Sequence, residues 1–268
     1  MVVVGRYTAH MPPVEKHAPG SFNWIELGTP DQNGAKAFYG SLLGWSFEDH
    51  SMGPMGVYTM FKLDGRDTGG CYQLGPQSQG VPPHWSLFVA SDNADETAAR
   101  ARQLGGTVMH GPFDVSDLGR MAVLRDPTGA VLGIWQPGKN TGLGIGGVNT
   151  LCWADLSTPD RQRAKAFYEG IFGWRITPGK DKSADDYLHL QNGHQYIGGI
   201  LPDDLRSKNT GAHWIVYFQV ADCAASAAKA RELGAAVLMG PMTMEAGSYA
   251  VIQDPQGAHF SLFQPVLR

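Results

Sequence analysis

The chain of 268 residues carries a net charge of −4, and 43% of its residues are hydrophobic and 17% charged. This length and apolar content predict two domains, and the weakly acidic balance gives no basic surface of the kind that binds nucleic acid. No apolar run approaches the ~18 residues that a membrane span requires, so we expect no membrane partner and a cytoplasmic location. Cys71, Cys152 and Cys223 lack the spacing of a zinc site or a disulfide framework.

A strand followed by an amphipathic helix is predicted at the start of the folded part. The strand covers residues 22–28, and the helix begins near Thr29, a candidate N-cap. Pro30 then takes the first helical position and Gln32 completes a capping box. The helix ends at Gly44, and its apolar residues have the spacing of one buried helix face: Ala35, Phe38, Tyr39, Leu42 and Leu43.

Short strands around residues 57–63 and 69–74 follow this helix, and then the same order restarts. A strand over 85–90, preceded by His84, leads to a helix over 93–104. Further strands are predicted near residues 108–109, 121–125 and 131–136. The order of a strand, a helix and further short strands therefore occurs twice before the middle of the chain, and we interpret each occurrence as a unit of one strand, one helix and three strands.

The second half of the chain repeats the first about 129 positions later. The repeated pairs are Phe38-Tyr39 and Phe167-Tyr168, Gly44-Trp45 and Gly173-Trp174, Gly69-Gly70 and Gly198-Gly199, His84-Trp85 and His213-Trp214, and Asp126-Pro127 and Asp254-Pro255. Because solenoid repeats have periods of only about 20–50 residues, this period indicates a duplicated domain. We expect an N-terminal arm over 1–20, domains over 21–137 and 149–268, and a glycine-rich linker over 138–148.

Two longer passages of the first half also have copies in the second. Thr-Pro-Asp…Ala-Phe-Tyr…Leu-Leu-Gly-Trp over 29–45 and Arg-Asp-Pro-Thr-Gly-Ala over 125–130 return over 158–174 and 253–258. These passages resemble the vicinal oxygen chelate superfamily of glyoxalases, bleomycin resistance proteins and extradiol dioxygenases. The tandem arrangement is similar to that of actinobacterial proteins labelled hydroxylases, a group that includes the mycobacterial 27 kDa antigen.

The resemblance covers residues 21–266 and implies an α+β fold of tandem glyoxalase/bleomycin-resistance/dioxygenase-like domains. The two βαβββ units of each domain would curl one sheet into an open cup. Metal-using members of the superfamily carry His and Glu ligands at particular positions of this cup. The corresponding residues here are Trp24, Ser86 and Gly133 in the first half and Trp153, Ile215 and Ser261 in the second. A divalent metal needs several converging His or carboxylate ligands, so we expect neither a metal nor another cofactor, with ligands from other positions left open.

Strand alternation predicts which side chains line each cup, because alternate residues of a strand face the same side. In the first strand Trp24 and Glu26 face the cup, and Ile25 and Leu27 face the helix. The predicted linings are Trp24, Glu26, His84, Ser86 and Phe88 in the first cup and Trp153, Asp155, His213, Ile215 and Tyr217 in the second. His189 and His259 replace Met60 and Val131, and if they face inward they make the second cup the better candidate for chemistry.

Glu26 and Asp155 are the first catalytic candidates, because a carboxylate on an apolar sheet face is costly unless it is paired. Each is either held by backbone amides or an arginine, or serves as a general base or as the polar anchor of a ligand. His84 and His213 are further candidates, with a surface role at the start of a strand as the alternative.

The tryptophans divide into two groups. Trp45, Trp85, Trp174 and Trp214 are expected in the core. Trp24 and Trp153 either fill the cups or stack on a ligand, together with Ser86, Phe88, Tyr217, His189 and His259 as ligand-binding candidates.

Three functions fit these features. The first, which we favour, is a protein that binds a small aromatic or hydrophobic molecule in a cup without metal ligands, with sequestration as one use. The second is a lyase, isomerase or hydroxylase-like enzyme that uses a cup carboxylate or histidine as base. The third is an interaction protein whose cups are filled by its own side chains, with the arm over 1–20 lying across one of them. The chain is expected to act as a monomer or homodimer.

Overall fold

The computed structural model describes residues 16–179, 187–206 and 210–266. The elements of the first half are β1 (Phe22–Thr29), α1 (Gln32–Leu43), β2 (Ser46–Ser51), η1 (Gly53–Met55), β3 (Val57–Leu63), β4 (Arg66–Gln73), η2 (Pro76–Ser78), β5 (His84–Ala90), α2 (Ala94–Gln103), β6 (Thr107–Val115), β7 (Gly119–Arg125) and β8 (Val131–Pro137). Those of the second half are β9 (Leu151–Ser157), α3 (Arg161–Phe172), β10 (Arg175–Pro178), β11 (Leu188–Asn192), β12 (Gln195–Ile200), β13 (His213–Gln219), α4 (Cys223–Glu232), β14 (Ala236–Met244), β15 (Gly247–Gln253) and β16 (His259–Pro265).

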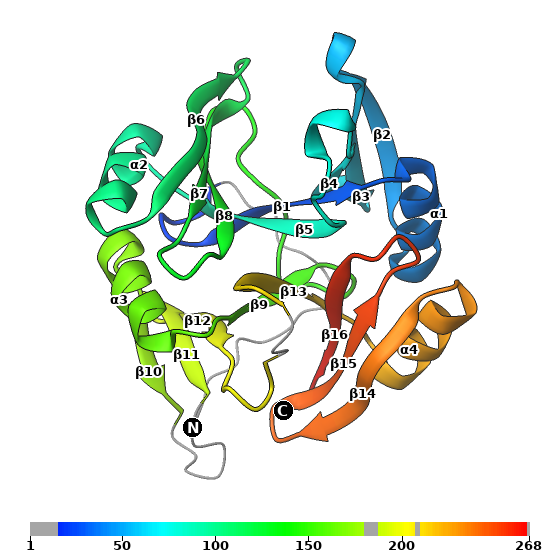
Figure 1. The fold of residues 1–268 in the computed structure, drawn as a ribbon. Helices are drawn as coiled ribbons and strands as arrows, with labels where there is room; N and C mark the ends of the chain where they lie inside the picture. Colours follow the sequence, from blue (N-terminus) through cyan, green and yellow to red (C-terminus); the bar gives the residue numbers. More distant parts are fainter. Residues whose placement is uncertain (1–15, 180–186, 207–209, 267–268) are drawn as a thin grey trace.

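Each half forms one eight-stranded mixed sheet, and the two sheets have the same strand order (Figure 1). The orders are β2-β3-β4-β1-β5-β8-β7-β6 and β10-β11-β12-β9-β13-β16-β15-β14. In the first sheet β1 pairs in parallel with β4 and antiparallel with β5, so the two βαβββ units meet at the centre of the sheet. The sheet curls without closing, and the predicted α+β fold with two open cups is confirmed.

Strand β2 has no counterpart among the strands that the sequence predicted. All six of its residues are exposed, so its sequence shows no alternation of apolar and polar residues. It forms because it pairs along its whole length with β3 at the edge of the sheet.

The first helix begins differently from the prediction. Its N-cap is Asp31, whose carboxylate accepts a hydrogen bond from the Gly34 N–H at 2.9 Å, while Thr29 is the last residue of β1. The Gln32 side chain does not complete a capping box, because its amide reaches across the sheet to the Thr59 hydroxyl at 2.8 Å. The expected end of the helix at Gly44 is confirmed, since this residue has the left-handed φ of 72°.

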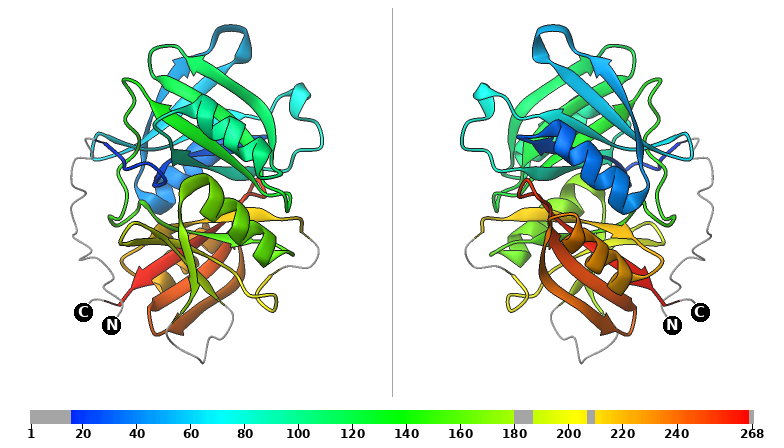
Figure 2. Two further views of the ribbon diagram at one scale, coloured as in Figure 1. Left: turned by 90° about the vertical axis from the view of Figure 1, so that its left-hand side faces the viewer. Right: turned by 90° about the vertical axis from the view of Figure 1, so that its right-hand side faces the viewer.

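The two domains pack back to back, and their cups open at opposite ends of the molecule (Figure 2). Helices α1 and α4 lie side by side on one flank of the waist between the domains, and α2 and α3 lie on the other (Figure 1). The convex faces share one core, in which the ring of Phe218 lies 5.3 Å from those of both Trp45 and Trp85. The predicted core tryptophans, including Trp174 and Trp214, are only 2–6% exposed, which confirms their role.

The repeated Asp-Pro and Phe-Tyr motifs meet at this waist. One carboxylate oxygen of Asp254 accepts three backbone N–H groups of its own turn, and the other accepts the Tyr39 hydroxyl of the first domain at 2.9 Å. In the same way, the Tyr168 hydroxyl of the second domain donates to the Asp126 carboxylate of the first domain, also at 2.9 Å. These motifs therefore join the domains rather than line a cup.

Residues 1–15 of the expected arm lie outside the described residues. The described end of the arm contacts both the linker and the second domain. His17 is hydrogen bonded to the Leu143 carbonyl at 2.9 Å, and the Trp174 indole donates to the Gly20 carbonyl at 2.7 Å. Within the described part of the chain, no helix is both long and apolar enough to cross a membrane.

Candidate functional site

The floor of the first cup is the central strand β1. Its residues alternate as predicted, with Ile25 and Leu27 fully buried behind the sheet. On the cup side Trp24 lies opposite Phe88, and Glu26 lies between Gly70 on one neighbouring strand and Ser86 on the other. The carboxylate of Glu26 therefore stands at the centre of the concave face.

Glu26 receives a single hydrogen bond from the described residues. The Tyr58 hydroxyl donates to one carboxylate oxygen at 3.0 Å, and the Trp24 indole donates to that hydroxyl, also at 3.0 Å. The glycine at position 70 makes this bond possible, because a Cβ there would lie 2.0 Å from the Tyr58 hydroxyl. The Glu26 side chain is part-exposed, so its second oxygen remains available to a ligand.

Burial raises the pKa of Glu26 to about 7, and the hydrogen bond from Tyr58 lowers it only in part. A carboxyl group with this pKa exchanges its proton readily near neutral pH. The site can therefore accept a hydrogen bond from a ligand hydroxyl or take a proton from it.

A second polar group of the cup lies one step further along β1. Gly28 has no side chain, and a Cβ there would meet the Tyr72 hydroxyl at 2.9 Å and the His84 ring at 3.1 Å. The Nδ1 atom of His84 is hydrogen bonded to the Pro82 carbonyl at 2.8 Å, which leaves Nε2 available. No described residue is hydrogen bonded to the Tyr72 hydroxyl, and both side chains are part-exposed.

The second cup holds its carboxylate differently. Asp155 is 3% exposed and accepts hydrogen bonds from Tyr187 at 2.6 Å, Tyr217 at 2.8 Å and Trp153 at 3.0 Å. Burial raises its pKa, while the tyrosine and tryptophan donors oppose that shift. Both oxygens are thus bonded by the protein itself, and no oxygen of Asp155 is left for a ligand.

Three predicted histidines, His189, His213 and His259, lie on other strands of the second sheet. The ring of His189 packs 4.9 Å from Tyr187, and burial lowers the pKa of His189 and of His259. His213 is hydrogen bonded through Nδ1 to the Gly211 carbonyl at 2.8 Å. None of the three is among the hydrogen-bond partners of Asp155, and that they favour the second cup for chemistry stays a prediction.

The predicted ligand-binding residues fall into two groups. Trp24 and Phe88 are only 5% and 2% exposed and form the floor of the first cup, whereas Ser86 and Trp153 are part-exposed. Tyr217 is 9% exposed and is committed to Asp155.

The sequence reasoning did not include Tyr58, Tyr72 and Tyr187, which complete the two sites. A signal was present for one pair: Tyr187 stands 129 positions after Tyr58, and each lies over the second glycine of a repeated Gly-Gly motif.

The residues at the metal positions of the fold do not fit a metal ion. The Trp24 indole is a hydrogen-bond donor already used by Tyr58, and Gly133 has no side chain, its place being taken by the Phe88 ring. Of the three metal positions in each cup, only one offers an oxygen, that of Ser86 in the first cup and that of Ser261 in the second. Among the described residues no group of three or more His, Cys, Asp or Glu side chains is placed to hold a metal. A divalent metal prefers a set of such ligands, so no chemical step here is assigned to one.

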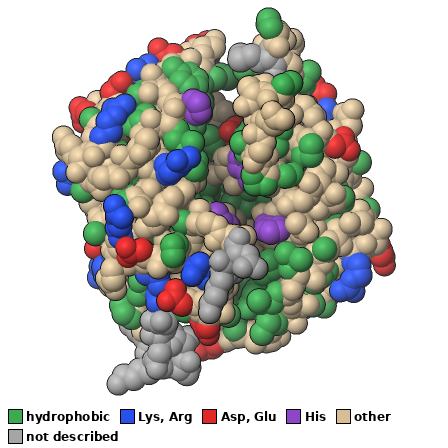
Figure 3. Space-filling model, viewed as in Figure 1, with side chains coloured by type: hydrophobic (Ala, Val, Ile, Leu, Met, Phe, Trp, Pro, Cys, Tyr) green, Lys and Arg blue, Asp and Glu red, His purple; other side chains and the backbone are tan. Residues whose placement is uncertain are grey.

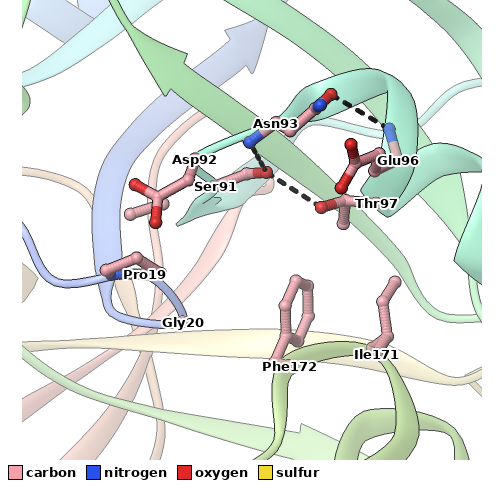
Figure 4. A pocket seen from close by; sticks show the side chains of 10 residues that line it. Pro19, Gly20, Ser91, Asp92, Asn93, Glu96, Thr97, Ile171 and Phe172 are labelled. Carbon is pink, nitrogen blue, oxygen red and sulfur yellow. Dashed lines mark hydrogen bonds between the residues drawn. The ribbon is translucent and has the colours of Figure 1, made fainter.

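The cups are open troughs and not enclosed cavities. Figure 3 shows the hollow between the two walls of the first domain, with histidine and acidic side chains among apolar ones. A separate cavity of about 210 Å³ lies beside Pro19 and Gly20, between the start of α2 and the end of α3 (Figure 4). Its polar side chains are used for helix capping, as when Asn93 accepts the Glu96 N–H. It is also smaller than the ~300 Å³ of a typical ligand site.

Comparisons with known proteins agree with this fold. A family model described as the glyoxalase/bleomycin resistance protein/dioxygenase superfamily matches residues 21–134, and one described as a glyoxalase-like domain matches residues 153–263. The protein named "Putative glyoxylase CFP32" of Mycobacterium tuberculosis is 36% identical over 95% of this chain and 98% of its own length. "Anthracycline biosynthesis protein DauV" of Streptomyces sp. is 34% identical over 93% of this chain and 94% of its own length.

Solved structures share the fold at much lower identity. The Mn(II)-bound glyoxalase of Novosphingobium aromaticivorans superposes with a TM-score of 0.65 at 15% identity. The alignment covers 92% of this chain and 82% of that one. At this identity the similarity establishes the fold alone.

Proposed function

The chain belongs to the glyoxalase/bleomycin resistance protein/dioxygenase superfamily, and within it we propose that the protein binds one flat aromatic molecule in its first cup. The second oxygen of Glu26 accepts a hydroxyl of that molecule. The observation that carries this proposal is the difference between the two carboxylates: among the described residues, Glu26 has one side-chain donor and Asp155 has three. A bound ligand would bury the free oxygen of Glu26, and a buried carboxylate oxygen without a donor is costly, so the site favours a ligand that supplies one.

The chemical class of the ligand follows from the rest of the lining. The rings of Tyr58 and Tyr72 and the side chain of Met60 are part-exposed beside Glu26 and offer apolar and aromatic surface. Methionine adapts its shape to a bound ring, and tyrosine stacks on one. The name of the relative DauV refers to anthracycline biosynthesis, and a hydroxylated polycyclic ring system would suit this surface.

The test uses 2-hydroxyanthraquinone, whose free hydroxyl can donate to Glu26, and its 2-methoxy analogue, which cannot donate. Calorimetry should give one bound molecule of the hydroxyl compound per chain. Glu26→Leu removes both oxygens and should weaken its binding about tenfold, the equivalent of ~1.4 kcal/mol for one hydrogen bond to a charged group. The methoxy analogue should bind the wild type and this variant equally.

His213→Ala is the control, because it alters a part-exposed histidine of the second cup, at the position that His84 has in the first. It should leave the affinity for 2-hydroxyanthraquinone unchanged. Two bound molecules per chain, or equal losses in the two variants, would show that the first cup is not the specific site.

A further inference from the structure

The first cup contains two unbonded polar groups that a simple binding site for one hydroxyl does not require. The Glu26 carboxylate has one free oxygen, and the Tyr72 hydroxyl has no partner among the described residues. They are separated by the place of the Gly28 side chain, where a Cβ would come within 2.9 Å of the Tyr72 hydroxyl. Glu26 and Gly28 are two residues apart on one face of the strand, so their Cα atoms are about 7 Å apart.

We infer that the first cup is a metal-independent proton-transfer site for an aromatic ketone, with Glu26 as base and Tyr72 as the hydrogen-bond donor to the ketone oxygen. This inference rests on the binding function proposed above and adds a reaction to it. The space between the two groups fits a ketone whose oxygen accepts the Tyr72 hydroxyl and whose carbon beside the carbonyl faces the Glu26 carboxylate.

The step balances without any further reagent. The carboxylate of Glu26 takes a proton from the carbon beside the carbonyl, the C–H electron pair forms the C=C bond of the enolate, and the carbonyl π pair moves to oxygen. The Tyr72 hydroxyl stabilises this oxygen by a hydrogen bond, as donors placed at a developing negative charge do. The protonated Glu26 then returns its proton to the same carbon or to a conjugated one, so the net reaction is hydrogen exchange or isomerisation.

Two further features of the lining fit this reaction. Burial raises the pKa of Glu26 to about 7, which suits a base that works near neutral pH. His84 stands beside Tyr72 with Nε2 free, and so it can accept a hydroxyl carried by the same ring system.

The second cup has His213 at the position of His84, but it lacks the other two groups and is therefore the internal comparison. Leu201 stands at the position of Tyr72 and Ser157 at that of Gly28, and the oxygens of Asp155 are both bonded. The reaction is therefore assigned to the first cup only.

The experiment uses the full chain and 2-tetralone, a ketone fused to a benzene ring, whose CH₂ group between the carbonyl and the aromatic ring is acidic. Proton NMR in D₂O follows the loss of that C–H signal, and calorimetry measures the binding of the same compound. The wild type should accelerate exchange above the buffer rate, with a rate that rises as the pH passes through about 7 because the base must be ionised.

Glu26→Gln keeps the shape of the side chain but cannot take the proton, so it should lower the exchange rate about 100-fold or more with 2-tetralone still bound. Tyr72→Phe should lower the exchange rate about tenfold or more, in line with the loss of one donor to a developing charge. Asp155→Asn, in the second cup, should exchange at the wild-type rate. If Asp155→Asn does not fold, His213→Ala takes its place.

Each other outcome is decisive. Binding of 2-tetralone without exchange, or exchange that survives Glu26→Gln, would overturn the inference and leave the binding function in place. Absence of binding for both 2-tetralone and 2-hydroxyanthraquinone would overturn the binding function and the inference together.

Discussion

The two cups have the same strands and the same central carboxylate position, yet they treat that carboxylate in opposite ways. Glu26 keeps one oxygen free and partly exposed, whereas Asp155 is buried under donors from Trp153, Tyr187 and Tyr217. Two differences between the copies account for this. Aspartate is one methylene shorter, which brings its oxygen within 3.0 Å of the indole N–H, and position 217 carries a hydroxyl that Phe88 lacks.

The waist between the domains shows no such divergence. The bond from Tyr39 to Asp254 and the bond from Tyr168 to Asp126 are both 2.9 Å long, and each tyrosine also accepts a tryptophan N–H. The duplicated packing is therefore retained where it holds the domains together. The copies differ in the cups, where a ligand would bind, and substitutions in the two cups can test this difference.

The largest effect is expected from removing the fully bonded carboxylate. Asp155→Ala removes the acceptor shared by Trp153, Tyr187 and the buried Tyr217. A typical hydrogen bond contributes about 0.5–1.5 kcal/mol and a buried donor left unpaired costs about 1–3 kcal/mol, so the free energy of unfolding should fall by ~3 kcal/mol. Glu26→Ala removes a carboxylate with one donor and should cost ~1 kcal/mol or less. Urea unfolding followed by circular dichroism measures both, and equal costs would contradict the structural role assigned to Asp155.

The next largest effect is the pH dependence of the unfolding free energy that results from the raised pKa of Glu26. The pKa of Glu26 is about 7 in the folded protein against 4.5 for an ordinary glutamate, so the folded state binds more protons between these values. Its contribution is therefore complete below pH ~4.5 and is lost as the pH rises through about 7, by up to ~1.4 kcal/mol per pH unit. The titratable groups around it are Tyr58, Tyr72 and His84 on the cup side and Cys71 behind the sheet.

Glu26→Gln isolates this contribution. The difference in unfolding free energy between wild type and variant, measured from pH 4 to pH 8, should change in favour of the variant as the pH rises. A difference that stays constant over this range would show that Glu26 has an ordinary pKa, which its position in the cup does not raise.

The fold could be predicted from the sequence because it depends on regular spacings of apolar and repeated residues. The repeat, the helix faces and the alternation around Trp24 and Glu26 all depend on local spacing, and the structure confirms them. Strand β2 was missed since an exposed edge strand has no alternation, and the capping box at Thr29 was wrong because Gln32 is recruited by a neighbouring strand. Both errors arise from tertiary contacts that sequence spacing does not encode.

The site was only partly accessible for the same reason. The carboxylates were found because a charge on an apolar strand face is unusual, but their inequality depends on which hydroxyls reach them. Tyr58 and Tyr187 reach the carboxylates from another strand, and each hydroxyl lies over a glycine where a side chain would block it. This role of the glycines is evident only once the pairing of the strands is known. The histidines that favoured the second cup stand at unshared positions, and their positions alone did not show that the hydrogen-bond partners of Asp155 are tyrosines and a tryptophan instead.

The smallest expected effect converts the first cup toward the second. Phe88→Tyr places a hydroxyl where Tyr217 has one, and this second donor should lower the pKa of Glu26 and occupy its free oxygen. The affinity for 2-hydroxyanthraquinone should then fall by several-fold, within the ~1 kcal/mol of one exchanged hydrogen bond. Tyr217→Phe is the matched reverse change, and it should leave that affinity unchanged while lowering stability by ~1 kcal/mol. Calorimetry and urea unfolding on the two variants separate these results. An affinity that survives Phe88→Tyr would mean that the ligand does not need the free oxygen of Glu26, and the contrast between the cups would then concern stability alone.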